Sequence, residues 1–272
     1  MKLSIMGPLE IIGPRGPAGI TAPRQRIVLT ALLLKSNRTV PVEMLIDAVW
    51  GENPPATARS QIHICVSNLR KRLARAGVFT LIDTQPLGYR ALVDGDELDL
   101  HRFDRLVADG RALVARGDLA AAAECLAAAL RLWREPAPLS GDHDWVRSMA
   151  GHIWDWRASV AEEYFDLRIT LGQATSILRD LTGLVAEYPF RERLRAQLMI
   201  SLYRAGRQVD ALAEYRDLHD LFARELSLRP GLELRRLQQD ILSGAAEHLA
   251  PTGSVAGADS PSGRYVAIGG LA

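Results

Sequence analysis

The chain has few of the residues that build disulfide frameworks or membrane spans. Two cysteines occur in 272 residues, Cys65 and Cys125, and both have apolar neighbours, so we expect small buried side chains and not a disulfide. No apolar run approaches the ~18 residues that cross a bilayer, and the apolar run at the N-terminus is too short for a signal peptide. The sequence therefore predicts a cytoplasmic protein that has no part in a membrane.

Sequence motifs of enzymes are missing too. The chain has no GxxxxGK[ST] phosphate loop, no GxSxG and no HExxH. His143, which lies between Asp142 and Asp144, has no second group of metal ligands nearby in the sequence, and we expect this segment to begin a helix that Asp144 caps. We therefore predict that the protein is not an enzyme and that it needs no cofactor or metal ion.

Acidic residues are missing from one stretch of thirty residues. Between Asn53 and Ile82 there is no Asp or Glu, whereas five cations occur there: Arg59, Arg70, Lys71, Arg72 and Arg75. The net charge of the whole chain is only +1, but residues 1–93 hold twelve Lys and Arg against five Asp and Glu, and the remainder holds twenty-one against twenty-seven. This division indicates a basic part that meets nucleic acid and an acidic part that has a different task.

The order of predicted elements in the first third is typical of a winged helix. Short antiparallel strands within residues 3–22, the last of them around Ile20, are followed by three helices and a hairpin. We predict the helices over 23–36, 42–50 and 56–76, and the hairpin strands over 78–83 and 89–93. In a winged helix the third helix enters the major groove of DNA, and the hairpin lies on the backbone or in the adjacent minor groove.

The third helix shows which side chains would meet DNA. On a helical wheel its apolar stripe faces the core and consists of Ile62, Val66, Leu69 and Leu73. The opposite side carries Ser60, Ile64, Ser67 and Lys71, with Gln61, Asn68 and Arg75 on one flank and Arg59, His63 and Arg70 on the other. Ile64 suits a thymine methyl group, Gln61 and Asn68 suit adenine, and Arg70 or Lys71 suits guanine or phosphate.

Cations outside this helix complete the predicted site. Arg24 and Arg26 begin the first helix, whose free N–H groups favour an anion, and Arg90 lies beside the hairpin turn. The predicted DNA-binding residues are Arg24, Arg26, Arg59, Ser60, Gln61, Ile64, Ser67, Asn68, Arg70, Lys71, Arg75 and Arg90. A cationic helix face is often only a solvated surface, and His63 alone suits a surface or partly packed position. The missing acids and the winged-helix order favour DNA.

From Glu97 onward the pattern is helical almost throughout. We predict a helix pair over 102–116 and 118–134, and a longer helix over 145–171. Gly172 and Gly206 stand 34 residues apart, and apolar or small positions match at this offset, which indicates tetratricopeptide-like helix hairpins. The concave face of such hairpins usually holds another protein. An ordinary helix bundle would give similar spacing, and a small molecule in the concave face is a further alternative.

We therefore predict a mainly α chain with a small β part, divided into three segments. Residues 1–95 form the winged-helix domain, and residues 96–243 form the tetratricopeptide-like helical domain. Residues 244–272 are rich in Ala, Gly, Ser and Pro and lack periodicity, so we expect a flexible tail.

An ordered set of segments resembles the Streptomyces antibiotic regulatory protein (SARP) family of transcriptional activators. The match runs over about residues 3–242. It includes Leu3 to Glu10, Pro23 to Arg26, Leu45 to Gly51, Pro54 to Arg59, Val66 to Leu73, Gly88-Tyr89, Glu97 to Phe103, Arg191 to Arg195 and Tyr203 to Arg207. The resemblance implies an OmpR-type winged helix followed by a bacterial transcriptional activation domain.

The resemblance also implies a way of working. Members of the family bind direct repeats in double-stranded DNA that overlap the −35 region of promoters for antibiotic or other secondary-metabolite genes, and they bind as head-to-tail dimers. They recruit RNA polymerase through its sigma and alpha subunits, and the loop from Trp50 to Thr57 would lie near the polymerase. Asn68 stands where many relatives carry arginine, so its base preference would differ.

The family resemblance leads to expectations on cellular location and on regulation by ATP, and two functions remain as alternatives. Such a protein would be associated with the nucleoid. Larger relatives add an ATPase region for which we find no motif, so we expect no control by ATP. Repression from the same kind of operator, and a scaffold whose winged helix binds protein, are the alternatives to activation.

Overall fold

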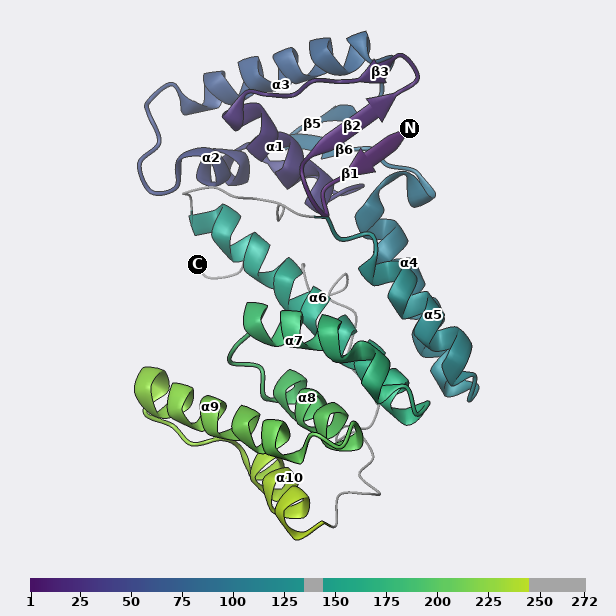
Figure 1. Cartoon of the computed structure of the whole chain (residues 1–272). Helices are drawn as coiled ribbons and strands as arrows, with labels where there is room; N and C mark the ends of the chain where they lie inside the picture. The colour runs from purple at the N-terminus through teal and green to yellow at the C-terminus, as the bar shows by residue number, and fades with distance from the viewer. Residues whose placement is uncertain (135–143, 245–272) are drawn as a thin grey trace. The chain divides into compact units, whose positions relative to one another are not determined.

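The computed structural model describes residues 1–134 and 144–244, and the chain divides into two compact units (Figure 1). The first unit comprises Met1–Leu106 and the described part of Ala129–Asp155, and the second comprises Val107–Ala128 and residues 156–244. The prediction of a mainly helical chain with a small β part is confirmed. His143 and the predicted tail from residue 245 onward lie outside the described residues. None of the helices described is both long and apolar enough to cross a membrane.

The first unit opens with three short antiparallel strands in the order β1-β2-β3. They are β1 Lys2–Ser4, β2 Glu10–Gly13 and β3 Gly16–Pro17. The strand expected around Ile20 is wrong, because the chain reverses immediately after Gly13 and pairs Gly16 with it. Gly16 has φ +114°, a value that favours glycine, and it places the third strand three residues earlier than expected.

Three helices follow the strands, as predicted. They are α1 Pro23–Leu34, α2 Val42–Trp50 and α3 Ala58–Arg75. Pro23 occupies the start of α1, where its missing N–H costs no hydrogen bond. The bounds of α2 are those predicted, and α3 ends just before Gly77, which adopts a left-handed φ of +82°.

A second small sheet carries the hairpin that the winged-helix pattern predicts. Its strands are β4 Val40–Pro41, β5 Ile82–Gln85 and β6 Gly88–Ala91, antiparallel in the order β4-β6-β5. The predicted hairpin is confirmed, but its strand bounds are wrong because Val78 and Leu81 are buried in the core without joining a strand. The sequence gives no sign of β4, since two residues are too short to show an alternating pattern.

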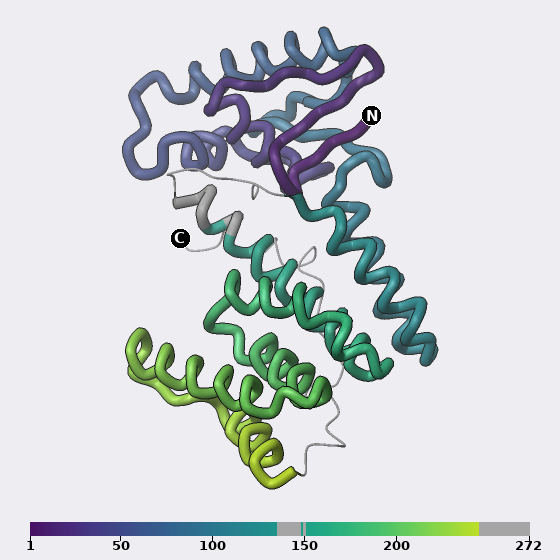
Figure 2. Tube along the Cα trace, in the orientation of Figure 1, coloured from purple at the N-terminus to yellow at the C-terminus, as the bar shows by residue number. Residues whose placement is uncertain are grey.

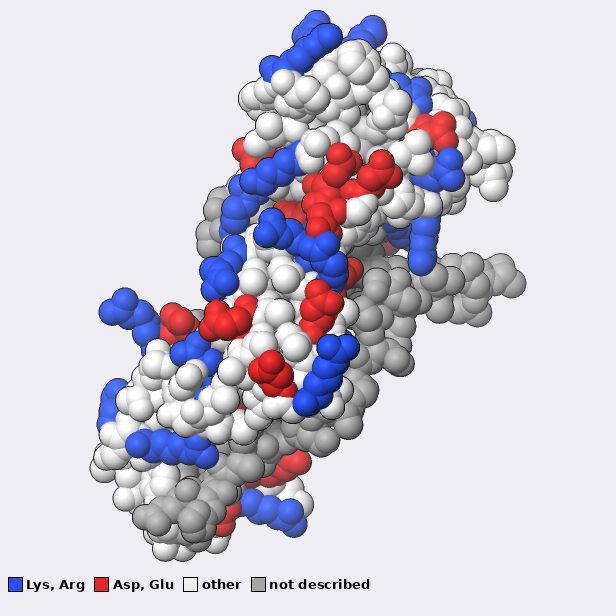
Figure 3. All heavy atoms as spheres, turned by 90° about the vertical axis from the view of Figure 1, so that its right-hand side faces the viewer, with Lys and Arg blue, Asp and Glu red and all other residues white. Residues whose placement is uncertain are grey.

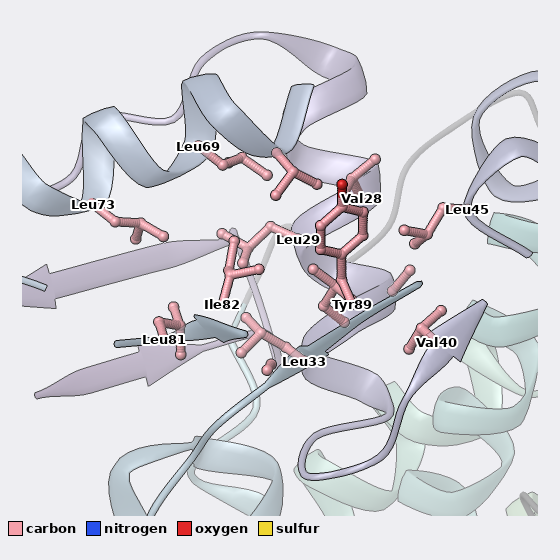
Figure 4. Packing of buried hydrophobic residues seen from close by; sticks show 14 of the residues in the cluster. Val28, Leu29, Leu33, Val40, Leu45, Leu69, Leu73, Leu81, Ile82 and Tyr89 are labelled. Atoms are coloured by element: carbon pink, nitrogen blue, oxygen red, sulfur yellow. The ribbon is translucent and has the colours of Figure 1, made fainter. Parts of the chain in front are cut away.

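One apolar stripe fastens α3 to the rest of the first unit. Ile62, Val66, Leu69 and Leu73 are all 1% exposed or less, as the helical wheel predicts. Figure 4 shows Leu69 and Leu73 pointing from α3 toward Leu29 and Ile82. Full burial of each such side chain contributes about 1.5–3 kcal/mol. The stripe therefore anchors α3 and leaves the other side of the helix available.

The segment after the hairpin is tied to the first strand. The Asp99 carboxylate accepts hydrogen bonds from the Ile5 N–H at 2.9 and 3.0 Å and from the Met6 N–H at 3.1 Å. Burial raises the pKa of Asp99, although these N–H groups pull it downward. Leu98 forms a parallel bridge with Leu3. The compact unit thus continues past residue 95, at which the sequence divides the two predicted domains.

The second unit is helical, and Figure 2 traces its chain. It takes the end of α4 Asp99–Ala115, most of α5 Leu119–Leu130, most of α6 Asp144–Thr170, the short η2 Ala174–Ile177, α7 Leu178–Glu187, α8 Glu192–Arg204, α9 Gln208–Leu226 and α10 Leu232–Ser243. Gly172 and Gly206 both have φ +75° and stand at equivalent turns, as the 34-residue offset requires. Tetratricopeptide-like stacking of these helices stays a prediction.

Acidic residues of α6 are buried inside the second unit. Glu162, Glu163 and Asp166 are each 9% exposed or less. Glu163 accepts two hydrogen bonds from Arg111, at 2.6 and 3.0 Å, and Asp166 pairs with an arginine at the start of α8. These buried carboxylates therefore hold helices of the second unit together.

Candidate nucleic-acid interface

The side of α3 that faces away from the core is exposed. Five of its side chains form what we call the reading face: Ser60, Ile64, Ser67, Asn68 and Lys71. Ile64 is 60% exposed, which is unusual for so apolar a side chain. Within the described residues, none of the five uses its side chain in a hydrogen bond or ion pair. Their polar groups are therefore available to a partner.

Positive charge accompanies the reading face. Arg26 on α1 and Arg75 on α3 are exposed, and neither has an ion-pair partner in the part of the chain that the structure describes. In Figure 3 the uppermost charged residues, where α3 runs in Figure 1, are all Lys or Arg. Arg59 does pair with Glu43 of α2, but both side chains are more than 60% exposed. Such surface pairs contribute about 0–1 kcal/mol, so a phosphate could replace the carboxylate.

One flank of α3 faces α1 and α2 across an open cavity of about 410 Å³. Here Arg24 donates to the Gln61 side-chain oxygen at 2.9 Å, and its guanidinium lies 5.2 Å from the ring centroid of Trp50. The Gln61 amide nitrogen donates to the Thr57 hydroxyl at 2.8 Å. Both ends of the Gln61 amide are thus used within the protein, and it orients Arg24 instead of facing outward with the reading face.

Cys65 lines the same cavity and is half-buried. Burial raises the pKa of its thiol to about 11, with Arg24 pulling it in the opposite direction. Cys65 and Cys125 are both free, so the expectation that they form no disulfide is confirmed. A half-buried thiol with a raised pKa holds little thiolate at neutral pH and is a weak nucleophile there.

The other flank of α3 faces the hairpin. Arg70 donates to the Ile82 carbonyl oxygen from Nε at 3.2 Å and from Nη2 at 3.0 Å, and to the Thr84 hydroxyl at 2.8 Å. His63 Nδ1 lies 2.6 Å from the Tyr89 hydroxyl oxygen. Arg70 lies on the flank where the wheel places it, but there it is bound to the hairpin and is not free to meet a partner from solvent.

Arg90 on the hairpin is also engaged. It donates to Asp83 at 2.9 Å, and this hydrogen bond is the main reason that the pKa of Asp83 is lowered. Of the twelve predicted residues, seven are exposed without a side-chain partner among the described residues, and these are Arg26, Ser60, Ile64, Ser67, Asn68, Lys71 and Arg75. The other five have internal partners, and these are Arg24, Arg59, Gln61, Arg70 and Arg90.

Residues outside the predicted set hold these five side chains in place. Thr57 fixes Gln61, Thr84 and Tyr89 receive Arg70, and Glu43 pairs with Arg59. Asp83 holds Arg90, and Trp50 lies beside Arg24. For Thr84 and Tyr89 the hairpin itself is the signal, because a hairpin placed beside α3 must turn some of its side chains toward the flank of the helix.

Two family models match the chain. Residues 20–91 match the model described as "Transcriptional regulatory protein, C terminal", and residues 98–242 match the model described as "Bacterial transcriptional activator domain". Together with the exposed basic helix of the winged-helix unit, they define a DNA-binding transcription regulator.

Known proteins are similar over most of the chain. "Regulatory protein AfsR" of Streptomyces griseus is 36% identical over 251 residues, which are 92% of this chain and 25% of AfsR. "Transcriptional regulator RedD" of Streptomyces coelicolor is 33% identical over 89% of this chain and 71% of RedD. The solved structure of Mycobacterium tuberculosis EmbR in complex with a low-affinity phosphopeptide has a TM-score of 0.81 at 35% identity, over 89% of this chain and 65% of that one.

The chain belongs to the SARP family of transcriptional activators, which confirms the resemblance read from the sequence. Its relatives are named as regulators and not as enzymes. The chain spans a quarter of AfsR and about two thirds of EmbR.

Proposed function

We propose that this protein activates promoters of antibiotic or other secondary-metabolite genes by binding direct repeats near the −35 element as a homodimer on DNA. In this proposal it recruits RNA polymerase through the sigma and alpha subunits. Residues 1–95 bind DNA, and residues 96–243 make the protein contacts, through tetratricopeptide-like stacking of their helices. The observation that carries the proposal is the reading face, a set of exposed polar and apolar side chains on a basic helix whose opposite stripe is buried.

The chemistry of the reading face suits the major groove. Asn68 can pair with the N6 and N7 edge of adenine, and Ile64 can cover a thymine methyl group. Lys71 and the exposed Arg26 and Arg75 supply phosphate contacts, which fix the register without reading sequence. In this proposal Asn68 and Ile64 contact the bases directly, and Ser60 and Ser67 add further contacts from the same face.

The first experiment measures DNA affinity as a function of salt. A duplex selected by the protein from a random pool is titrated at several salt concentrations, with fluorescence anisotropy as the readout. If each copy neutralises about 4–6 phosphates, log K falls against log salt with a slope near −0.9 per phosphate. A slope close to zero contradicts DNA binding through this surface.

Two variants separate positioning on the duplex from reading of the sequence. Lys71→Ala should weaken binding to all duplexes and make the slope shallower by about 1, whereas Asn68→Ala should relax the choice at one base pair by about 1–3 kcal/mol. Arg229→Ala is the matched control, because it removes an exposed cation from the second unit. An equal loss on every duplex for Asn68→Ala would contradict its assigned role.

The second experiment decides the direction of regulation. Run-off transcription with purified polymerase, from a promoter that carries the selected repeats, should yield more transcript when the protein is added. Less transcript would show repression from the same operator, and no change despite DNA binding would remove polymerase recruitment from the proposal.

A further inference from the structure

The junction between α3 and the β5–β6 hairpin contains a bridge made by one arginine. Arg70 donates three hydrogen bonds to β5, two of them to the Ile82 carbonyl oxygen and one to the Thr84 hydroxyl, at 2.8 to 3.2 Å. Its guanidinium also lies 5.8 Å from the ring centroid of Tyr89 on β6. A single side chain of α3 therefore contacts both strands of the hairpin.

The position of Ile82 explains why its carbonyl is available. β5 is an edge strand, since the order of the sheet is β4-β6-β5. The Leu92 N–H donates to the Leu81 carbonyl at 2.8 Å, and alternation along an antiparallel ladder then turns the Ile82 carbonyl away from β6. An outward carbonyl on an edge strand needs a donor from elsewhere, and Arg70 supplies it.

A second contact from the same flank of α3 supports the first. His63 precedes Arg70 by seven residues, so both lie on one side of the helix. His63 Nδ1 lies 2.6 Å from the hydroxyl oxygen of Tyr89, a residue that is only 6% exposed. The hairpin is thus held to α3 at two points, one on each strand.

We propose that Arg70 is a positioning residue that fixes the hairpin against α3, so that the hairpin and the reading face engage one duplex as a preformed unit. The inference rests on the proposed function and assigns different tasks to two adjacent cations. Lys71 is exposed without an internal partner among the described residues and contacts phosphate, whereas Arg70 has three of its five donor N–H directions occupied by β5. Arg70 keeps its charge, but only two of its N–H groups remain to donate to a phosphate, so we expect it to make no direct phosphate contact.

The salt dependence of binding distinguishes these tasks. Lys71→Ala should make the slope of log K against log salt shallower by about 0.9, as expected for one lost phosphate contact. Arg70→Ala should lower affinity for the selected duplex about tenfold at every salt concentration and leave the slope unchanged. Arg70→Lys is the second test, because a lysine keeps the charge but cannot reproduce the planar fork that bridges β5. It should bind as poorly as Arg70→Ala.

The free protein gives a readout that does not involve DNA. Amide hydrogen exchange of residues 82–91 should be faster in Arg70→Ala than in the parent chain, while the exchange of α9 stays the same. Thr84→Val removes one acceptor and leaves Arg70 in place, so it should lower affinity about threefold with an unchanged slope. This milder variant keeps the test valid if Arg70→Ala fails to fold.

Three outcomes would overturn the inference. They are a slope change for Arg70→Ala equal to that of Lys71→Ala, full affinity in Arg70→Lys, and unchanged hairpin exchange in Arg70→Ala. Failure of the proposed function is a separate result, because the parent chain would then show no salt-dependent binding while the exchange experiment would still report the bridge.

Discussion

Ile64 offers the sharpest test of the reading face, because the side chain is apolar, large and exposed. Replacing it by alanine removes little packing, since Ile64 is not part of the buried core of the first unit and 60% of the residue is already open to solvent. The free energy of unfolding should therefore change by less than about 0.5 kcal/mol. An effect of Ile64→Ala on DNA binding would then report a contact with DNA and not a loss of folded protein.

The size of that effect follows from the exposed surface. Full burial of an isoleucine side chain contributes about 1.5–3 kcal/mol, so covering the 60% that is open would contribute about 1–2 kcal/mol. This corresponds to a loss of roughly 5- to 30-fold in affinity when Ile64 is shortened. The assay is anisotropy titration of the selected duplex at constant salt, with urea unfolding as the control for stability.

A double-mutant cycle locates the partner of Ile64. Each thymine of the selected site is replaced in turn by deoxyuridine, which lacks only the C5-methyl group. At the contacted base the loss from deoxyuridine should disappear in Ile64→Ala, which gives a coupling energy of at least about 0.5 kcal/mol. Coupling at no thymine, or an affinity unchanged by Ile64→Ala, would refute the proposed methyl contact.

Three further predictions concern stability and reactivity. Gly88→Ala should lower the free energy of unfolding in urea by about 1–3 kcal/mol, because a Cβ there would lie 2.0 Å from the Val40 carbonyl oxygen. Gly183→Ala is the control and should lower it by nothing, because a Cβ there meets no atom within 4 Å. Equal losses in the two variants would refute the prediction. Cys65, whose thiol pKa is about 11, should be only about 0.1% thiolate at pH 8. It should therefore react with a thiol reagent far more slowly in the folded protein than in the protein unfolded by urea. Equal rates would show that the fold does not protect the thiol. Burial raises the pKa of Asp166 above its usual 3.8, so the folded state holds this proton more tightly and the carboxyl lowers stability as the pH rises above about 4. The stability of Asp166→Asn relative to the parent chain should therefore improve as the pH rises above about 4, and a decline would contradict the direction of the pKa shift.

The sequence best predicts those parts of the fold in which apolar residues recur at a regular spacing. The sequence predicts the helices over 42–50 and 145–171 almost to the residue, because their apolar spacing and the glycines or prolines beside them leave little choice of bounds. The stripe from Ile62 to Leu73 was predicted for the same reason. A two-residue strand such as β4 is too short to show an alternation of apolar and polar residues, so only its pairing with β6 defines it.

Side-chain partners were the part of the site that sequence could not supply. Gln61 meets Arg24 across 37 residues, and Arg70 meets Thr84 across 14. A helical wheel gives the direction in which a side chain leaves the axis of its own helix. It does not show which other element of the fold lies on that side of the helix. Residues with free donors and acceptors, such as Asn68, and residues already engaged, such as Gln61, are therefore indistinguishable until the fold is known.

The small number of free side chains has a consequence for how many copies must bind. A bidentate contact such as that available to Asn68 discriminates by about 1–3 kcal/mol, and covering a thymine methyl with Ile64 adds an amount of the order of 1 kcal/mol. One copy then reaches roughly 2–4 kcal/mol, whereas specific regulators exceed their own non-specific binding by about 4–10 kcal/mol. Because Gln61 and Arg70 have internal partners, they do not fill this gap. Two copies on two repeats double the free energy by which one copy prefers its specific site. We therefore expect a dimer on DNA, as proposed, and not a single bound chain.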